Sequence, residues 1–520
     1  MTSDGTDGTD EPSTAPGSAM PLGRRRRLAI VTAVAVLVVA VLGVGTYAAV
    51  RLIGGGPHPE DVLPASTIAV VSVDLDPSAG QKIEAIRTMR KFPDLRKQID
   101  LGPGDDVRKL IFDKMIASGG CRSMSFDRDV GSWLGNRAAL GAVDLGEASP
   151  TPVLALQVQD AAAARRGLDR IMACSHPADV GIAMAAGYAI ISDSTAHARL
   201  IVADGRSHDL ADDASYQHWT GQTGDAGVLS FYVAKSAADL GLRELDRGMF
   251  GADLGSLKDT LKGFRGMAGT LRFSEGGAEL ATATGGVHAT DGSAVGDAVG
   301  RLPADTALAL GIGVPGDYAT TLVDRVAGLD GGTRTAFIKQ TRAQTGLRLP
   351  EDLQTMLGTA LVLSVDGTPP RQLSSLDGIS SLPAAVTVTG DGPGIDAVLS
   401  RVQHRTRTSL ADLGLTERKD DTHVTVATSA TYAARVRQHG DLGSDGTFEK
   451  VVPDADHAVA VFFLRIDDAW RQKIAELVGN ASGPADAAAV DSDLAPFQAL
   501  GFSAWNDGGI THTLLKLATN

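Results

Sequence analysis

The sequence predicts an α+β protein: two homologous tandem lobes with mainly antiparallel sheets, preceded by a single transmembrane helix. One observation behind this prediction is an uncharged apolar run near the N-terminus. The other is a set of motifs that occurs twice in the same order. The composition, 43% hydrophobic and 21% charged over 520 residues, allows several domains and excludes collagen, a coiled coil and a wholly disordered chain.

The N-terminal part predicts the location of the chain. Residues 1–27 are rich in Asp, Gly, Thr and Ser and end in four arginines, which is typical of a disordered cytoplasmic tail. Residues 28–50 carry no charge, and at ~1.5 Å per residue they are long enough to cross a hydrocarbon core of ~30 Å. Only Arg51 follows directly, so we expect the N-terminus in the cytoplasm and everything after this anchor outside the cell membrane. Residues 51–60, which contain three glycines, form the linker.

A cleaved signal peptide is the alternative interpretation of this segment. Thr46-Tyr47-Ala48 loosely resembles a cleavage site, but the apolar run exceeds the ~7–15 residues usual in signal peptides. We therefore expect a signal anchor that remains attached.

The exterior region contains an internal repeat. Leu63-Pro64-Ala65-Ser66-Thr67 recurs as Leu302-Pro303-Ala304-Asp305-Thr306. This order predicts extracytoplasmic lobe 1 over residues 61–291 and lobe 2 over 292–520. The further matches pair Asp129 with Asp352, Pro152 with Pro383, Asp160 with Asp391, Leu168 with Leu399, Leu210 with Leu442, Asp213 with Asp445, Tyr216 with Phe448, Phe231 with Phe463, and Gly276 with Gly508.

Each lobe has the pattern of mixed helices and strands. Gly276-Gly277 and Gly508-Gly509 are typical of hairpin turns, and Asp160 is a suitable N-cap for an alanine-rich helix that ends at Cys174. In lobe 1 we expect strands at residues 67–75, 138–143, 153–158, 188–192, 228–234 and 267–273.

Three segments are similar to a known family: Leu63 to Pro93, Asp129 to Gly135 (DVGSWLG), and the strand around Gly187-Tyr188-Ala189. On these segments the chain resembles the actinobacterial membrane-anchored family of domain of unknown function 3352. The resemblance covers most of the exterior region. It implies a membrane-anchored location and the two-lobe architecture, and it names no activity and no site residue.

Two segments resemble known binding motifs. The comparison between the lobes argues against the first as a binding site, and residue spacing argues against the second. Gly311 to Gly316 matches a dinucleotide fingerprint, but the equivalent Asp74 to Pro77 lacks the glycines, which favours a strand–helix turn. Asp74, Asp76 and Ser78 are spaced like the start of a calcium loop. Ala79 and Ala85 stand where that loop needs a glycine and a bidentate acid, so Asp76 is better explained as a helix cap.

The residue types that bind metals are most densely clustered at His208, Asp209, Asp212, Asp213 and His218. The comparison between the lobes argues against a metal site here as well. Lobe 2 keeps two of these aspartates, as Asp441 and Asp445, which favours a helix cap over a metal site. Neither a Gly-x-Ser-x-Gly elbow nor a Ser-x-x-Lys motif occurs in the sequence. We therefore predict no catalytic, cofactor-binding or metal-ligating residue and no cofactor.

The two cysteines of the chain, Cys121 and Cys174, both lie in lobe 1. An oxidising exterior favours a disulfide between them. Two buried free thiols and pairing between chains are the alternatives.

One segment near the predicted anchor is basic. Lys82, Arg87, Arg90, Lys91, Arg96 and Lys97 stand against two acids, whereas the lobe 2 counterpart, residues 317–330, has Arg325 as its one base. Contact with anionic lipid headgroups or an anionic wall polymer is one interpretation, and a solvated helix face is the other. An apolar side of this helix is predicted from Ile83, Ile86, Met89 and Phe92.

These observations predict a non-enzymatic, membrane-anchored binding or scaffolding protein of the bacterial cell envelope. The alternative is a carrier of a lipid or other apolar ligand, and a third hypothesis is an envelope hydrolase assembled from distant residues. The net charge of −14 lies in the exterior region, because the tail has equal numbers of acids and arginines, and it argues against a nucleic-acid partner. The sequence names no protein partner.

Overall fold

The computed structural model describes residues 57–75, 79–93, 106–119, 121, 123–175, 180–246, 261–274, 276–286, 292–326, 331–370 and 382–520. The predicted tail, the predicted transmembrane helix and most of the linker lie outside these residues. Within the described ranges, no helix combines the length and the apolar character that a membrane span needs.

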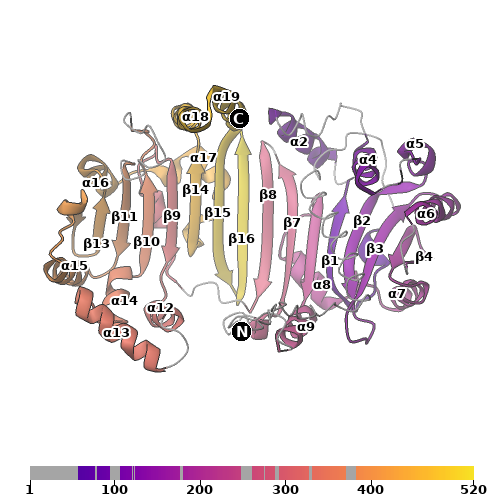
Figure 1. The fold of residues 1–520 in the computed structure, drawn as a ribbon, viewed down its shortest axis with the longest axis horizontal. Helices are drawn as coiled ribbons and strands as arrows, with labels where there is room; N and C mark the ends of the chain where they lie inside the picture. The colour runs from indigo at the N-terminus through magenta and orange to yellow at the C-terminus, as the bar shows by residue number, and fades with distance from the viewer. Residues whose placement is uncertain are drawn as a thin grey trace, which may run out of the picture. The chain divides into compact units, whose positions relative to one another are not determined.

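The fold is α+β with one large antiparallel sheet of 16 strands (Figure 1). The lobe 1 strands are β1 (Thr67–Asp74), β2 (Leu134–Val143), β3 (Thr151–Val158), β4 (Gly181–Ala185), β5 (Tyr188–Ser192), β6 (Leu229–Ala234), β7 (Gly266–Ser274) and β8 (Gly277–Gly285). The lobe 2 strands are β9 (Leu308–Gly313), β10 (Ala360–Val365), β11 (Ala384–Thr389), β12 (Thr416–Lys419), β13 (His423–Ala427), β14 (Ala460–Arg465), β15 (Phe497–Asp507) and β16 (Ile510–Thr519).

The two lobes share this sheet rather than having one sheet each. Strand β8 of lobe 1 pairs antiparallel with β16 of lobe 2, from Gly285 opposite Ile510 to Gly277 opposite Ala518. Outward from this pair, lobe 1 has the order β8-β7-β6-β1-β2-β3-β5-β4, and lobe 2 has β16-β15-β14-β9-β10-β11-β13-β12. Each strand of lobe 1 has the same place in its order as the counterpart strand of lobe 2, so the two strand orders are identical.

The helices lie between the strands in the chain. Those of lobe 1 are η1 (Pro59–Asp61), α2 (Ala79–Arg90), α4 (Val107–Gly119), α5 (Phe126–Asp129), α6 (Ala161–Ser175), α7 (Thr195–Ser207), α8 (Ala214–Gly221) and α9 (Lys235–Asp246). Those of lobe 2 are α11 (Gly296–Gly300), α12 (Tyr318–Val326), α13 (Gly331–Thr345), α14 (Glu351–Leu357), α15 (Gly392–Thr406), η3 (Ala411–Leu413), α16 (Ala430–Arg437), η4 (Leu442–Ser444), α17 (Gly446–Val451), η5 (Ala455–His457), α18 (Asp468–Ser482) and α19 (Pro484–Leu494).

The strands predicted in lobe 1 are all present, with ends shifted by a few residues. Strand β4, which no sequence pattern predicted, forms a hairpin with β5. The glycine-rich segment after Gly311 is the end of β9 and the turn before α12, as the comparison between the lobes predicted.

Local contacts recur in the two lobes. The hydroxyl groups of Thr67 and Thr306 each donate to the carbonyl oxygen three residues earlier, of Pro64 and Pro303, at 2.7 Å. Leu210 and its counterpart Leu442 are both fully buried. The repeated sequence motifs therefore have repeated structural roles.

The predicted pairing of Phe231 with Phe463 is wrong by one residue. In the sheet, Tyr232 lies opposite Val70, and Phe463 lies opposite Ala309, which is the counterpart of Val70. Tyr232 also makes an edge-to-face contact with Tyr216, as Phe463 does with Phe448, at 5.2 Å between ring centroids in both cases. Phe231 points to the other face, because successive strand residues alternate between faces.

The predicted pairing of the hairpin glycines is also wrong by one residue, in the opposite direction. Gly276, with φ 76°, directly precedes β8, and Gly509, with φ 81°, directly precedes β16. Gly276 therefore corresponds to Gly509 rather than to Gly508. Both positions need the left-handed conformation that glycine adopts without strain.

The sheet has two different faces. On the face that we call the core face, helices α7, α8, α11, α16 and α17 pack over two clusters of buried side chains, one in each lobe. Ile190 and Tyr232 belong to the lobe 1 cluster, and Val362 and Phe463 to the lobe 2 cluster. The opposite face carries the residues that alternate with these.

Candidate functional site

The face opposite the core face carries a row of apolar side chains across the sheet. In lobe 2 the residues of this row lie directly opposite one another on neighbouring strands. Because side chains alternate between the two faces along each strand, residues paired in this way lie on the same face. We call these residues the apolar row: Val386, Leu363, Leu310, Phe462, Phe502 and Leu515. From Leu515 the row continues into lobe 1 through Leu280, Leu271 and Leu229.

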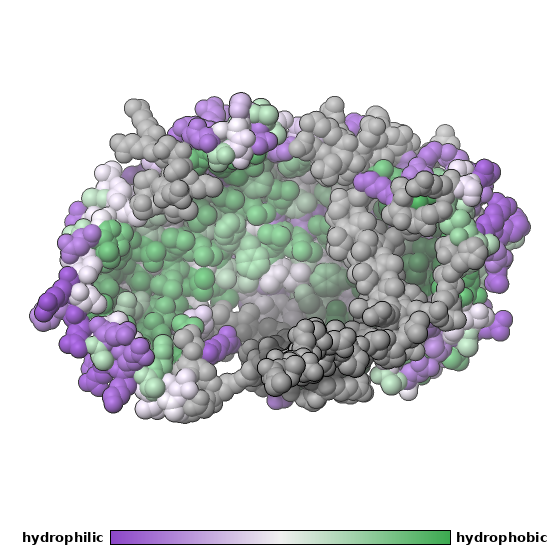
Figure 2. All heavy atoms as spheres, in the orientation of Figure 1, coloured by the Kyte–Doolittle hydropathy of each residue, from purple (hydrophilic) through white to green (hydrophobic). Residues whose placement is uncertain are grey.

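Part of this face is exposed in lobe 2. Val386 and Leu515 of the apolar row are 39% and 38% exposed, and Ile312, two residues after Leu310 on the same face, is 39% exposed. Figure 2 shows hydrophobic residues gathered over this part of the sheet, with hydrophilic residues around its rim. Neighbouring exposed apolar side chains of this kind are typical of a binding surface.

In lobe 1 helices cover the same face. Phe112 of α4, Phe126 of α5 and Leu168 of α6 form a buried cluster with Ala189 of β5. Nearer the centre, Ala85 of α2 is buried against Phe273 of β7.

The counterpart of α4 in lobe 2 does not pack in this way. None of residues 332–345 of α13 is buried. The carbonyl of Ala343 in α13 accepts hydrogen bonds from Arg405, the penultimate residue of α15, at 2.6 and 3.0 Å. At its other end, Arg334 pairs with Asp324 of α12. Helix α13 is thus held by its neighbouring helices, and Ile312 of β9 and Val386 of β11 are more exposed than their counterparts Val73 and Leu154.

A buried aspartate at equivalent places in both lobes holds the covering helices. Asp129 accepts hydrogen bonds from the side chains of Arg128 and Arg170, both at 2.8 Å, and from the backbone N–H of Ser125 at 3.0 Å. The hydrogen bond from Arg128 and that from Ser125 hold the pKa of Asp129 well below its usual range, against the effect of burial. This site links α5 to α6.

Asp352 has the same arrangement in lobe 2. Burial opposes ionisation, but hydrogen bonds from Arg348 and the charge of Arg401 lower the pKa of Asp352. The sequence matched the aspartates and missed the arginines, although Arg170 and Arg401 each follow the matched Leu168 and Leu399 by two residues.

The predicted basic segment is described only in part. Arg87 is exposed and pairs with Glu84, Arg90 is exposed, and the side chain of Lys82 with Arg96 and Lys97 lies outside the described residues. Lys91 instead donates to the Thr519 hydroxyl of β16 at 2.9 Å. Burial, with the nearby charge of Lys450, lowers the pKa of Lys91. Arg87 and Arg90 are thus the described members of this segment that face solvent.

The apolar side predicted for this helix is wrong in one respect. Ile83 is 51% exposed, whereas Ala85, Thr88 and Met89 are buried. The helix turns its small residues to the sheet because α2 lies close against β7 and β8.

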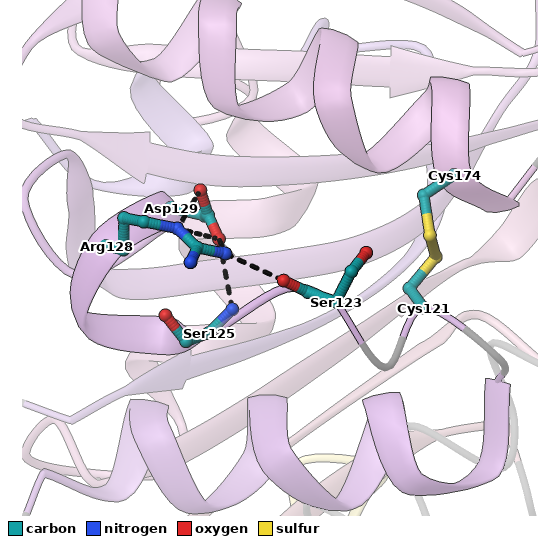
Figure 3. Close-up of a disulfide and its surroundings, with 6 residues drawn as sticks. All are labelled: Cys121, Ser123, Ser125, Arg128, Asp129 and Cys174. Carbon is teal, nitrogen blue, oxygen red and sulfur yellow. Dashed lines mark hydrogen bonds and ion pairs between the residues drawn. A yellow bond between two sulfur atoms is a disulfide. The ribbon is translucent and has the colours of Figure 1, made fainter.

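Cys121 and Cys174 lie together as a disulfide, with 5.7 Å between their Cα atoms (Figure 3). Cys174 is in the last turn of α6, and Cys121 lies shortly before α5. Next to the disulfide, Arg128 donates to the carbonyl of Ser123 at 2.7 Å as well as to Asp129. The disulfide and Asp129 therefore fix the same two helices.

The other motifs have structural roles. Asp213 and Asp445 cap helices α8 and α17 by accepting from the N–H groups of Tyr216 and Phe448. His208 and Asp212 lie between α7 and α8 and not on one helix face. Asp74 pairs with Arg137 at 2.8 Å, and the remaining calcium-like positions, Asp76 and Ser78, lie outside the described residues. Among the described residues no three His, Cys, Asp or Glu side chains are grouped as metal ligands.

One histidine arrangement was not predicted. His197 of α7 lies between Asp193, 2.5 Å from its Nδ1, and Glu147, 3.0 Å from its Nε2. The hydrogen bond with Asp193 is the main cause that raises the pKa of His197. The i, i+4 spacing of Asp193 and His197 was visible in the sequence, but the loop that brings Glu147 was not.

No protein-family model, no curated protein and no solved structure matches this chain.

Proposed function

We propose that this protein is a membrane-anchored, non-enzymatic binding protein of the bacterial cell envelope, whose apolar row binds the acyl chains of a lipid. The observation that carries the proposal is the exposure of Ile312, Val386 and Leu515 on one continuous apolar face. Of the functions that the sequence predicted, this geometry favours the lipid carrier over the scaffold.

The length of the apolar row favours an elongated ligand. The apolar row runs from Val386 to Leu515 across neighbouring strands that are ~4.8 Å apart, so it offers a track of about 25 Å. An acyl chain gains ~0.8 kcal/mol for each CH₂ group that it buries. A ligand that covers several strands would therefore gain most of its affinity from this row.

The location is part of the same proposal. The uncharged segment 28–50 anchors the chain in the membrane, and the short linker 51–60 keeps the sheet close to the lipid surface. We also propose that the two lobes are homologous and that the chain is a member of the family of domain of unknown function 3352. The identical strand order of the two lobes supports the homology.

The test uses the full chain in detergent and a fluorescent fatty acid as the probe. Replacing both Ile312 and Val386 with threonine keeps the β-branched shape and removes apolar surface, so we expect the double variant to bind the probe at least tenfold more weakly. The control is Leu413→Thr, since Leu413 is exposed in η3, away from the row.

Unchanged probe affinity in the double variant would reject the proposal. A face that is instead covered by a second copy of the chain would give dimers in sedimentation experiments, and the same double variant would make these dimers dissociate. Thermal melts of each variant exclude a loss of folding as the cause.

A further inference from the structure

Lobe 2 contains a cavity of about 340 Å³ on the core face, opposite the apolar row. Its floor is formed by Val362 of β10, Thr387 and Thr389 of β11, and Thr425 and His423 of β13. These residues alternate with those of the apolar row, so the cavity and the row lie on different faces. Helix α11, the end of α16 and the segment after it form the walls.

Lobe 1 is an internal comparison for this cavity, because strand pairing identifies the equivalent residues. Thr387 pairs with Thr425, and Thr389 with His423. At the same positions of lobe 1, Ala155 pairs with Ile190, and Gln157 with Tyr188.

Larger apolar side chains occupy this space in lobe 1. Ile190 and Tyr188 are fully buried, and the Tyr188 hydroxyl donates to the carbonyl of Pro57 at 2.9 Å. Lobe 2 has a threonine and a histidine at these two positions. The polar lining is thus specific to lobe 2 and is not a property of the shared fold.

The helix that covers the site is also shorter in lobe 2. Helices α7 and α16 begin at equivalent serine N-caps, Ser194 and Ser429, each of which accepts from the N–H three residues later. Helix α7 has 13 residues and α16 has 8, so α16 ends at Arg437. Because α16 stops early, Gln438 and His439 lie outside the helix and line the wall of the cavity beside Val436.

The floor is rich in groups that both donate and accept hydrogen bonds. The hydroxyl groups of Thr387 and Thr425 are 3.0 Å apart; Thr425 is fully buried beneath the floor, and the half-buried Thr387 keeps capacity for another partner. His423 contacts the Thr422 hydroxyl through Nδ1 at 2.9 Å, which leaves its Nε2 for a ligand. A ligand with hydroxyl groups can satisfy these side chains in either direction.

The charged groups of the cavity balance each other. Arg437 pairs with Asp420, and Arg301 lies 3.9 Å from Asp297. Hydrogen bonds from the N–H of Thr422 and from Arg437 hold the pKa of Asp420 well below its usual range, so this carboxylate stays ionised. An anionic ligand would have to compete with these aspartates for the arginines, which favours a neutral ligand.

We propose that this cavity is a binding site for a small neutral polyhydroxylated ligand, a carbohydrate of monosaccharide size. The volume suits one sugar ring with its hydration, and the apolar part of the lining, including Val362 and Val436, suits the C–H faces of the ring. The proposal does not depend on the lipid ligand of the apolar row.

The test measures binding of glucose, galactose, mannose and ribose to the full chain by ligand-observed NMR and calorimetry. The detergent must have no sugar headgroup. We expect at least one of these sugars to bind with a dissociation constant of millimolar or below, and acetate and inorganic phosphate not to bind. Failure of all four sugars up to 50 mM (roughly fiftyfold above that constant), or binding of the anions alone, would overturn the proposal.

Two variants place the binding in the cavity. Thr387→Val keeps the shape and removes one hydroxyl group, and we expect it to weaken sugar binding about tenfold. A triple variant, T387A/H423Y/T425I, gives lobe 2 the lining of lobe 1 and should abolish binding. The matched control is Thr513→Ala, which removes a threonine from another hydroxyl pair, with Thr282, at 2.7 Å on the apolar side of the sheet. Sugar affinity that is equal in all these variants would show that the cavity is not the site.

Discussion

Tyr188 and His423 occupy equivalent positions in the two lobes, yet Tyr188 is fully buried and His423 lines a cavity. One position of a repeated sheet thus supports a packed core in lobe 1 and an open site in lobe 2. The difference depends on the side chain and on the length of the covering helix, since the strand order is the same. The two lobes share the strand order and differ in the surfaces that they build on it.

The disulfide is expected to stabilise lobe 1. Cys121 and Cys174 are 53 residues apart, and closing a loop of that length contributes about 4 kcal/mol in the chain-entropy model. The double variant C121A/C174A should therefore unfold at a lower urea concentration than the oxidised parent, and the reduced parent should behave like the variant. Thiol labelling of the denatured, unreduced monomer gives the independent check, because two labelled cysteines would show that no disulfide forms.

Asp129 is expected to contribute strongly to stability. Its side chain is 3% exposed, and replacing it with asparagine removes the charge-assisted hydrogen bonds from Arg128 and Arg170. Because these arginines are 64% and 57% exposed and stay solvated, we expect a loss of about 2 kcal/mol. Asp127→Asn is the matched control, because Asp127 is 73% exposed in a surface pair with Lys109 and should cost less than about 1 kcal/mol. Urea unfolding measures both, and equal losses in the two variants would contradict this role.

The contribution of Asp129 to the free energy of unfolding should decrease at acidic pH. The pKa of Asp129 is lowered in the folded state, so its contribution is present above the unfolded pKa and is lost as pH falls through the folded value. The parent should therefore lose more stability than Asp129→Asn when acidified below about pH 4. A parallel pH dependence in parent and variant would reject this assignment.

His197 is expected to have the opposite pH dependence. Its pKa is raised by Asp193 and Glu147, so its stabilisation is complete below the unfolded value of about 6.5 and is lost as pH rises through the folded pKa. NMR titration of the His197 ring should show a midpoint above that of an unperturbed histidine. Asp193→Asn should move the midpoint down, and a midpoint that does not move would exclude Asp193 as the cause.

The exposed arginines of α2 are expected to contact anionic membranes. The double variant R87Q/R90Q should bind vesicles of anionic lipid more weakly than the parent, with a larger difference at low salt. Lys91 is left unchanged because it bonds to Thr519. Arg165 and Arg166, exposed on α6, provide the control pair R165Q/R166Q. If the parent itself does not bind these vesicles at any ionic strength, α2 is only a solvated helix face.

The sequence was sufficient for features that depend on local patterns. The Leu-Pro-Ala motif, the N-cap aspartates and the hairpin glycines each act within a few residues, so their repetition predicted the repeated strands. The register of Tyr232 was missed because the spacing between matched motifs changes across the intervening loop. A shift of one residue is invisible in an alignment of apolar residues, although it changes the face of the sheet.

The candidate sites depended on tertiary packing that no local pattern contains. Phe337 and Ile338 give α13 an apolar side like that of α4, yet α13 is held by α12 and α15, away from the sheet. Likewise, the cavity depends on where α16 ends relative to β13. The sequence contains the threonines of the floor, but it does not show that they face an open space.

The pairing of β8 with β16 has a consequence for biosynthesis. Residues 510–519 form a central strand of the sheet, although they are translated after every other strand of that sheet. Until they emerge, β8 and β15 have unpaired backbone edges in the middle of the apolar face, where they can pair with another chain. Folding should therefore require protection of both edges until β16 is made, and ribosome stalling before residue 510 should give aggregation-prone chains.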